Sequence, residues 1–445
     1  MPLSISPLDG RYRTKVAELL PIFSEFGLMR ARTAVEIRWL IFLSEKKISP
    51  ELSKSAQKKL EKVLKNFGEK EYAAIKKIEA KTNHDVKAVE IFLQKFVPKN
   101  HWSWIHFACT SEDINSCAYG LILKNGVNAL AAPLDAVTKI LKKNAKTWKS
   151  VPMLARTHGQ TATPTTVGHE FAVFWVRGNR VIQSAKRVPF FGKFAGATGN
   201  FAAHAAAFPK KNWSKLSKEF VEKSLGLDWN GMTTQIESHD AAAALLNEFS
   251  QLSNIFIDLS RDIWGYISLG YFGQKKVDGE VGSSTMPHKV NPIDFENAEG
   301  NLKLARGIAR TLADELPISR FQRDLTDSTL QRNFGLVFGH FLLALKSLEK
   351  GLGKLELRKD VLKKDLKNAP EVLTEAVQTV LRKNGHADAY DQLKNFSRGK
   401  KLSLDEIRKF VAGTKLPPAE KKLLENLTPE TYTGEAAKLV DEFLK

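Results

Sequence analysis

The chain has 445 residues, of which 43% are hydrophobic and 26% are charged, so it is long enough for a large buried core and two or three domains. Lys and Arg number 68 against 49 Asp and Glu, and the resulting net charge of +19 favours anionic partners. Two cysteines exclude a disulfide framework, and their spacing does not suit zinc. The sequence contains neither an apolar signal region nor 18 uncharged apolar residues in a row, so we expect a cytoplasmic protein without a membrane span.

The excess of positive charge is spread over helical segments rather than gathered in one arm. Residues 58–72 and 346–367 mix lysine with glutamate at helical spacing, which is typical of solvated helix faces. Aromatic residues that could stack on bases do not interleave with these lysines. We therefore expect no nucleic-acid partner, although a binding patch is the alternative interpretation of these segments.

Four long segments have apolar residues at three- and four-residue spacing, which predicts long amphipathic helices. They are residues 119–148, with a bend near Pro133, then 165–187, 245–270 and 292–316. At ~1.5 Å per residue each would span on the order of 30–40 Å, and helices of that length need long helical neighbours to bury their apolar faces. Alternating strand patterns are scarce. The sequence predicts an all-α fold with a central bundle of long helices.

Two segments indicate domain boundaries within this helical chain. A proline follows an amphipathic run in FVPKN (96–100), and glycines interrupt KGLGK (350–354). We expect an N-terminal helical domain over residues 1–99, the long-helix domain over residues 100–352 and a C-terminal helical domain over residues 353–445.

Two polar segments have the residues of helix starts. KTNHDVKAVE contains Asn83, His84 and Asp85, and CTSEDIN contains Thr110 and Ser111. Ser111 before two acidic residues fits a helix N-cap. The free N–H groups and hydroxyls of a helix N-terminus also bind a carboxylate. The sequence leaves both interpretations open.

A histidine and a group of arginines are the next candidates for chemistry. His158 lies in ARTHGQTATPTT, where it is either a structural hydrogen-bonding group or a proton donor near neutral pH. SRFQRDLTDSTLQRN places Arg323 and Arg332 near hydroxyl side chains, which suits a phosphate because guanidinium groups bind oxyanions in a bidentate manner. The alternative is that both arginines pair with Asp324 and Asp327.

The segment GSSTMPHKVNP (282–292) combines a flexible start, two hydroxyls and a proline with His288, Lys289 and Asn291. The sequence has no glycine-rich nucleotide loop, no HExxH and no GxSxG. We therefore expect no metal and no cofactor, and a site built for proton transfer on an anionic substrate.

Several of these motifs together resemble one known family. GSSTMPHKVNPIDFE resembles the signature of the fumarase/aspartase superfamily, and DGRY, KTNHDVKAVE, TSEDIN, RTHGQ, TQIE and RDLTDST are similar to the adenylosuccinate lyase family in its long bacterial form. The motifs extend in family order from Asp9 to Arg332. The resemblance implies elimination of fumarate from adenylosuccinate to give AMP, and from succinylaminoimidazole carboxamide ribotide (SAICAR) to give AICAR. It also implies a homotetramer with a central helix bundle and active sites shared between subunits.

The resemblance further implies roles for individual residues. His158 would be the general acid, supported by Glu296, and Ser283 would be the general base. Lys289 and Asn291 would stabilise the charge that develops on the substrate. The residues implied to bind or orient the substrate are Arg11, Tyr12, Asn83, His84, Asp85, Thr110, Ser111, Gln235, Lys289, Asn291, Arg323, Ser328, Thr329, Leu330, Gln331 and Arg332, with His84 also in the catalytic set.

Two alternatives to this function are open. The first is a sibling lyase, such as a fumarase, an aspartase or an argininosuccinate lyase. The histidine in MPHK and the phosphate-suited arginines favour a nucleotide substrate instead. The second is a non-catalytic basic binding protein derived from the superfamily. The argument against it is the presence of the whole implied catalytic set, namely His158, Ser283, Lys289 and Glu296.

Overall fold

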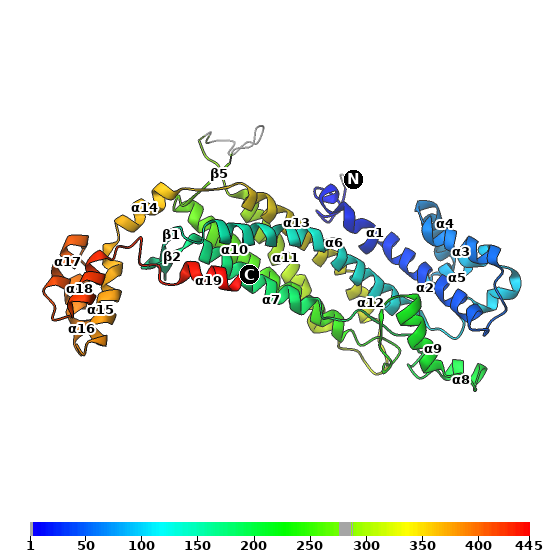
Figure 1. The fold of residues 1–445 in the computed structure, drawn as a ribbon. Coiled ribbons are helices and arrows are strands. Elements are labelled where there is room, and N and C mark those ends of the chain that lie inside the picture. Colours follow the sequence, from blue (N-terminus) through cyan, green and yellow to red (C-terminus); the bar gives the residue numbers. More distant parts are fainter. Residues whose placement is uncertain (1–2, 276–285, 287) are drawn as a thin grey trace. The chain divides into compact units, whose positions relative to one another are not determined.

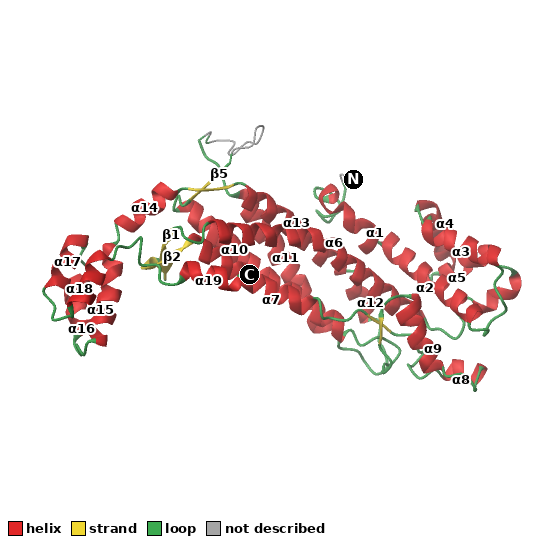
Figure 2. Cartoon of the chain, viewed as in Figure 1, coloured by secondary structure: helices red, strands yellow, loops and turns green. Residues whose placement is uncertain are grey.

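The computed structural model describes residues 3–275, 286 and 288–445 (Figure 1). Helices make up most of the described chain, and strands occur only as short pairs (Figure 2). The predicted all-α fold is confirmed. Among the described residues, no helix is both long enough and apolar enough to span a membrane.

The helices are long in the middle of the chain and short near its end. The α-helices are α1 (Leu20–Phe23), α2 (Glu25–Glu45), α3 (Lys54–Lys65), α4 (Glu69–Thr82), α5 (Asp85–Leu93), α6 (Ser111–Thr147), α7 (Val167–Ala185), α8 (Ala202–Ala207), α9 (Trp213–Glu219), α10 (Asp240–Ser268), α11 (Ile293–Glu315), α12 (Thr326–Gln331), α13 (Phe334–Gly353), α14 (Lys359–Lys367), α15 (Thr374–Lys383), α16 (Ala389–Ser397), α17 (Leu404–Ala412), α18 (Pro418–Asn426) and α19 (Ala436–Phe443). Short 3-10 or π turns cover Arg13–Leu19, Gln94–Phe96, Lys99–Trp104, Phe220–Ser224 and Pro370–Leu373.

Six short strands form three separate pairs. β1 (Pro152–Thr157) and β2 (Gln160–Thr166) make an antiparallel hairpin. β3 (Phe191–Gly192) pairs in parallel with β4 (Asp228–Trp229), and β5 (Phe272–Gln274) pairs antiparallel with β6 (Leu355–Leu357).

The chain divides into two units, which are described separately. The first unit comprises the chain up to Leu134 with residues 181–254 and 300–346, and the second comprises residues 135–180, 255–299 and 347–445. The predicted division into three domains, with boundaries after residues 99 and 352, stays a prediction. The second of these boundaries falls at the end of α13.

The first unit contains a core formed by α2, α3, α4 and α5, which lie together in the blue part of Figure 1. Met29, Ile37, Leu60 and Phe92 are buried in this core. Ser24 and Ser53 cap α2 and α3 by accepting hydrogen bonds from backbone N–H groups, which satisfies donors that a helix start leaves free.

A second core of the first unit is aromatic. Trp39 on α2 contacts the rings of Phe42, Phe194 and Phe220 at centroid distances of 4.5–5.7 Å. These rings bury a large apolar area where α2 meets the loop before α8 and the turn after α9. This core lies beside the start of α6, where the predicted site residues Thr110 and Ser111 are found.

The second unit contains a small helical core near the C-terminus. Leu366, Leu381, Leu393 and Val411 are buried together, and α15 to α18 form the orange cluster of Figure 1. Leu154 of β1 is part of the same core, so the hairpin is fixed on α14 and the following helices. This packing holds the turn that carries His158.

The predicted long helices are found, but their ends differ from the predicted ones. The helix predicted over residues 245–270 is α10, which begins at Asp240 and ends at Ser268. α6 begins at Ser111 rather than Tyr119. Glu112, Asp113, Asn115 and Ser116 are polar but buried, so this part of the helix lacks the apolar spacing on which the prediction depended. The helix predicted to begin at Thr165 begins at Val167, since the threonines before it form β2. Pro133 lies inside α6. Gly270 follows α10 in a left-handed conformation with φ 77°, whereas Gly273 lies in β5.

Candidate functional site

The start of α5 brings three of the predicted substrate residues together in the first unit. Asn83 follows α4 with φ 50°, a left-handed conformation that turns the chain sharply. His84 is the N-cap of α5, because its Nδ1 accepts a hydrogen bond from the N–H of Lys87 at 3.2 Å. Its side chain is otherwise exposed, so the ring can both cap the helix and face a ligand.

Asp85 lies between two arginines. Its Oδ2 atom is 2.6 Å from NH1 of Arg32 and 3.3 Å from NH2 of Arg332, and its Oδ1 accepts from the N–H of Val86. Burial raises the pKa of Asp85, but Arg32, the Val86 N–H and Arg332 outweigh it and leave the pKa below its ordinary value. Asp85 is therefore ionised near neutral pH and holds both guanidinium groups.

Arg332 has a second carboxylate partner. Its NH1 is 2.9 Å from Oε2 of Glu25, at the start of α2. The alternative in which Arg332 pairs with Asp324 or Asp327 is therefore not what the structure shows, since Asp324 pairs with Arg320 instead. The guanidinium of Arg332 is partly exposed, so it can still receive an anion beside its two carboxylates.

The start of α6 is held by the buried carboxylate of Asp113. This group accepts hydrogen bonds from the N–H groups of Thr110, Ala195 and Gly196 at 2.7–3.1 Å. Lys193, which is also fully buried, is 2.7 Å away and balances the charge. Asp113 thus satisfies the N–H of Thr110, the residue before α6, and Ser111 is the first residue of α6 rather than the predicted N-cap.

Arg323 is the most enclosed of the predicted phosphate residues. NH2 is 2.9 Å from Oε1 of Glu112 and 3.7 Å from Oδ1 of Asp327, and NH1 donates to Oε1 of Gln235 at 3.3 Å. Pairing with Asp327, one of the two interpretations of the sequence, is therefore present, with Glu112 as the closer partner. Burial raises the pKa of Glu112, and Arg323 and the Asn115 amide offset this only in part.

Gln235 connects this arginine to a neighbouring loop. Its amide Nε2 donates to the carbonyl of Ala197 at 2.9 Å, and its backbone N–H donates to Gln322. The predicted residues Gln235 and Arg323 are thus in contact, although 88 positions separate them in sequence.

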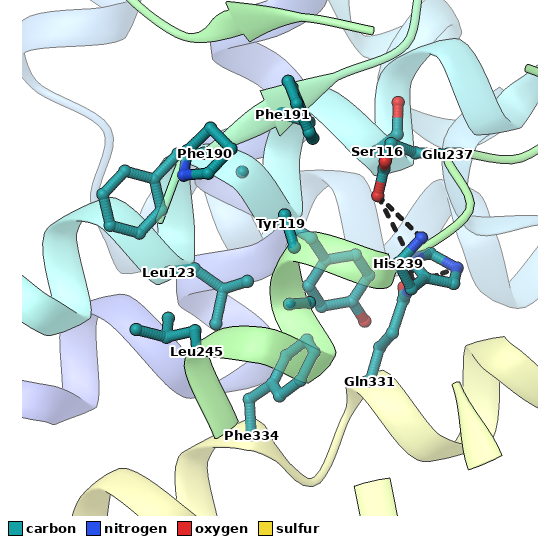
Figure 3. A pocket seen from close by; sticks show the side chains of 14 residues that line it. Ser116, Tyr119, Leu123, Phe190, Phe191, Glu237, His239, Leu245, Gln331 and Phe334 are labelled. Atoms are coloured by element: carbon teal, nitrogen blue, oxygen red, sulfur yellow. Dashed lines mark hydrogen bonds and ion pairs between the residues drawn. The ribbon is translucent and has the colours of Figure 1, made fainter. Parts of the chain in front are cut away.

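A small pocket beside these groups is lined by Gln331, another predicted residue (Figure 3). The amide nitrogen of Gln331 is 3.1 Å from Nε2 of His239. The Nδ1 atom of His239 is 3.7 Å from Oε2 of Glu237, and its Nε2 atom is 3.6 Å from Oδ2 of Asp327. Figure 3 shows Glu237, His239 and Gln331 converging from α12 and the segment before α10. Tyr119 and Phe334 also line this pocket.

The other predicted residues of the first unit lie nearer the surface. Arg11 stands 5.8 Å from the centre of the Tyr12 ring, and the Tyr12 N–H donates to the carbonyl of Pro7. Ser328, Thr329 and Leu330 lie on the short helix α12, which also carries Asp327. No contact between these residues and the Arg323 guanidinium is recorded in the described part of the chain, apart from that of Asp327.

His158 lies in the second unit, at the tip of the β1–β2 hairpin. Thr157 and Gln160 are paired, so His158 and Gly159 form a two-residue turn. Both have positive φ, 52° and 74°, as a type I′ turn requires. The His158 side chain is exposed. The sequence indicated no hairpin here, because its alternation is broken by the bulge between Met153 and Ala155.

Glu296 and Lys289 also lie in the second unit and are exposed. Glu296 accepts a hydrogen bond from Nε1 of Trp264 at 3.1 Å rather than from His158, so the predicted histidine–glutamate pair stays a prediction. Asn291 precedes α11. Ser283, the predicted base, lies outside the described residues. Over the described residues, no group of three or more potential ligand side chains could hold a metal ion.

Several residues of this network were missed by sequence reasoning. They are Glu25, Arg32, Asp113, Asn115, Lys193, Glu237 and His239. One signal was available: Arg32 and Glu36 are charged and one turn apart on a helix that is otherwise rich in apolar residues. Buried charged side chains are usually paired, so this pattern indicates a network of buried charges. It does not identify the residues with which Arg32 and Glu36 pair.

Comparison with known proteins identifies the class to which this chain belongs. The family described as Lyase matches residues 10–307, and the family described as Adenylosuccinate lyase C-terminal matches residues 319–433. Two solved structures share the fold. A fumarate lyase from Mesorhizobium sp. BNC1 has a TM-score of 0.79 at 20% identity, covering 96% of this chain and 97% of that chain. A 3-carboxy-cis,cis-muconate lactonizing enzyme from Pseudomonas putida has a TM-score of 0.74 at 21% identity, covering 96% of each chain. The family match over residues 10–307 puts the chain in the class of the lyases.

Curated relatives narrow the class. Proteins named adenylosuccinate lyase from Vibrio cholerae serotype O1 and Escherichia coli strain K12 are 47% and 46% identical to this chain over 448 residues. A protein of the same name from Haemophilus influenzae is 46% identical over 452 residues. Each alignment covers 99% of this chain and 98% of the relative. The chain belongs to the adenylosuccinate lyase family.

Proposed function

We propose that this protein is an adenylosuccinate lyase, which eliminates fumarate from adenylosuccinate to give AMP, and from SAICAR to give AICAR. The observation that carries the proposal is the identity of 46–47% with proteins of that name over almost the whole chain. The residues described above fit this reaction. His158 is exposed and can transfer a proton, and Arg332 is partly exposed and can bind an anion. The expected cytoplasmic location and the three-domain division belong to the same proposal.

The reaction breaks the bond between the succinyl carbon and the purine amino nitrogen. In our proposal Ser283 removes a proton from the adjacent succinyl carbon, and His158 donates a proton to the departing nitrogen. Loss of the carbon-bound proton places negative charge on the neighbouring carboxylate. Lys289 and Asn291 supply donors for that charge, and preorganised donors stabilise a transition state more than the bound substrate.

The residues of the first unit would bind the rest of the substrate. Thr110 and Ser111 supply a hydroxyl pair at the N-terminus of α6, which suits a succinyl carboxylate. Arg332 is partly exposed beside α12, and Arg323 is enclosed next to Gln235. These two arginines, with Arg11, Tyr12 and Ser328, would hold the phosphate of the nucleotide.

We further propose that the protein is a homotetramer whose active sites are shared between subunits. His158, Lys289 and Glu296 are all exposed in a single chain, whereas proton transfer of this kind requires a site closed to water. Long helices of the bundle also expose large apolar side chains, namely Val173 on α7, Trp264 on α10 and Ile293 on α11. A second and third copy of the chain would cover both the exposed site residues and the exposed apolar side chains.

The activity is tested by mixing the purified protein with adenylosuccinate and following release of AMP and fumarate. Substrates of fumarase, aspartase and argininosuccinate lyase serve as parallel controls. We expect release from adenylosuccinate and from SAICAR alone. Release from one of the control substrates only, or no release by a folded assembly, would contradict the proposed function.

Shared active sites are tested by mixing two defective variants. His158→Ala and Arg323→Ala alter residues of different units, and each variant should have low activity alone. If sites are shared, chains of the two variants that are refolded together form some sites with neither substitution, so activity rises above that of either parent. The matched control refolds each variant by itself. A mixture no more active than its parents would indicate that each chain carries its own complete site.

A further inference from the structure

Arg32 is a buried arginine that none of the roles above includes. It lies on α2, and only 2% of it is exposed. A guanidinium group in such a place is unfavourable unless each of its charged donors finds a partner. The partners that it has therefore indicate what this residue does.

The two recorded partners of Arg32 belong to two different helix starts. Its Nε donates to Oδ1 of Asn115 at 2.8 Å, in the first turns of α6, and its NH1 donates to Oδ2 of Asp85 at 2.6 Å, the first residue of α5. These two helix starts carry His84 and Asp85, and Thr110 and Ser111. One planar guanidinium thus fixes two segments of the proposed substrate site.

From Arg32, a chain of polar contacts leads to each of the two phosphate arginines. On one side, Asn115 donates to Oε1 of Glu112 at 2.6 Å, and the same oxygen is 2.9 Å from NH2 of Arg323. On the other side, Asp85 reaches Arg332 at 3.3 Å. Arg32 is the branch point of this network, and all its contacts lie within the first unit.

We propose that Arg32 is a positioning residue for nucleotide binding, which aligns Arg323 through Asn115 and Glu112, and Arg332 through Asp85. The inference rests on the proposed function, because it concerns the site for the phosphate of that substrate. Arg32 itself does not touch the substrate. Its effect is to hold two guanidinium groups at a fixed separation, so that phosphate binding does not have to order them.

The experiment replaces Arg32 with lysine, which keeps the charge but cannot donate to Asp85 and Asn115 in the same fork geometry. We expect the KM for adenylosuccinate to rise on the order of tenfold, with kcat within about twofold, because the loss is in binding rather than in proton transfer. Two variants on the same helix serve as controls. Arg38→Lys makes the same change at an exposed position, and Thr33→Val removes a buried hydroxyl that donates to Met29.

A binding comparison separates positioning from general destabilisation. Calorimetry with AMP and with adenosine measures the contribution of the phosphate alone. Arg32→Lys should weaken AMP binding on the order of tenfold and adenosine binding by less than about twofold. Thr33→Val should leave the ratio of the two affinities unchanged. Equal weakening of AMP and adenosine in Arg32→Lys, or no weakening of either, would overturn the proposal.

Hydrogen exchange gives a readout that does not depend on activity. In Arg32→Lys the amides at the starts of α5 and α6 should exchange faster, while those of α9 should not. If Arg32→Lys does not fold, Asn115→Ala replaces it, since this change cuts only the chain to Arg323 and should loosen only the start of α6. Unchanged exchange there would refute the inference even if the wild-type protein lacked lyase activity. Lack of activity with the expected exchange pattern would refute only the proposed function and leave the role of Arg32 in ordering the two helix starts.

Discussion

His158 stands in a backbone conformation that few non-glycine residues adopt. Its φ of 52° is in the left-handed region, which costs on the order of 1 kcal/mol or more for a residue with a Cβ atom. Gly159 shares the turn at φ 74° without that cost. The hairpin thus holds an exposed imidazole at its tip, which is the position that the proposed general acid of a shared site would need.

The role of His158 is tested by substitution with alanine. If it is the general acid, kcat should fall by roughly 10²–10⁴-fold, the range that general acid–base catalysis contributes. Circular dichroism should remain that of the wild-type protein, because the side chain is exposed and makes no recorded contact in the described part of the chain. Turnover near the wild-type value would exclude the role.

His204 is a buried histidine that has no part in the proposed chemistry. It is 1% exposed, lies among the rings of Trp39, Phe201 and Trp213, and neither of its ring nitrogens has a hydrogen-bond partner among the described residues. Burial lowers its pKa from 6.5 to about 4. The folded protein therefore holds this ring neutral, whereas the unfolded chain takes up a proton below pH 6.5.

This difference predicts a stability loss in acid. Above pH 6.5 the His204 ring is neutral in both the folded and the unfolded chain, so its titration does not lower the free energy of unfolding. As pH falls from 6.5 toward 4, protonation of the unfolded chain lowers that free energy by roughly 3 kcal/mol for a pKa shift of this size. His204→Phe removes the titrating group and two unsatisfied nitrogens, so Tm should rise at pH 7 and fall less steeply between pH 6.5 and 4. A Tm profile parallel to that of the wild-type protein would contradict this.

At the scale of elements, α7 and α10 bring acidic side chains of the second unit together. Burial, together with the nearby carboxylates of Asp258 and Glu170, raises the pKa of Asp262 to about 6, and Arg177 opposes this shift. Arg177 pairs with Asp258 at 2.6 Å, and Glu170 accepts from Tyr266, so Asp262 has the least compensation of the three. The two helices therefore pack with an acid that is partly protonated near pH 6.

Asp262→Asn tests this arrangement. The pKa of Asp262 in the folded protein is above the unfolded value of 3.8. Its contribution to the free energy of unfolding is therefore fully present below pH 3.8 and is lost as pH rises through 6. The variant should therefore raise Tm at pH 7.5 and change it little at pH 4. Asp258→Asn is the matched control, since it breaks the pair with Arg177 and should lower Tm at pH 7.5. A lower Tm for Asp262→Asn at pH 7.5 would show that this carboxylate has an ionic partner.

At the scale of the whole molecule, the long helices expose apolar side chains that a single chain leaves in water. Leu304 on α11 is 52% exposed, and its helix has buried alanines and leucines on another side. A helix that exposes apolar side chains outside its buried face is expected where copies of a chain meet. This agrees with the proposed homotetramer.

Leu304→Glu should disrupt that assembly. Multi-angle light scattering should give about four times the chain mass of 49.8 kDa for the wild-type protein and a smaller particle for the variant, because a buried, unpaired carboxylate opposes association. Lyase activity should fall with the assembly. Leu3→Glu, at an exposed leucine outside the helices, is the matched control. A variant that keeps the mass of the wild-type assembly would move the interface away from α11.

Much of the fold could be predicted because it depends on local periodicity. The helices that became α7, α10 and α11 follow from apolar spacing alone, and their observed ends differ from the predicted ends by a few residues. The start of α6 was missed because Glu112, Asp113 and Asn115 are polar yet buried, and only their partners from elsewhere in the chain make that burial possible. The hairpin of His158 was missed because a bulge breaks the strand pattern.

The amino-acid sequence by itself determined the helical class and the family, because periodicity and motifs are local and survive without knowledge of contacts. It also identified Arg323, Arg332 and His158 as candidates by residue type. Only the tertiary structure decided which charges neutralise one another. Arg32 meets Asp85 across 53 positions and Asn115 across 83, and Arg323 meets Glu112 from α6. The reason is physical: an ion pair depends on the distance between two side chains in space, and that distance is set by the packing of helices rather than by separation along the chain.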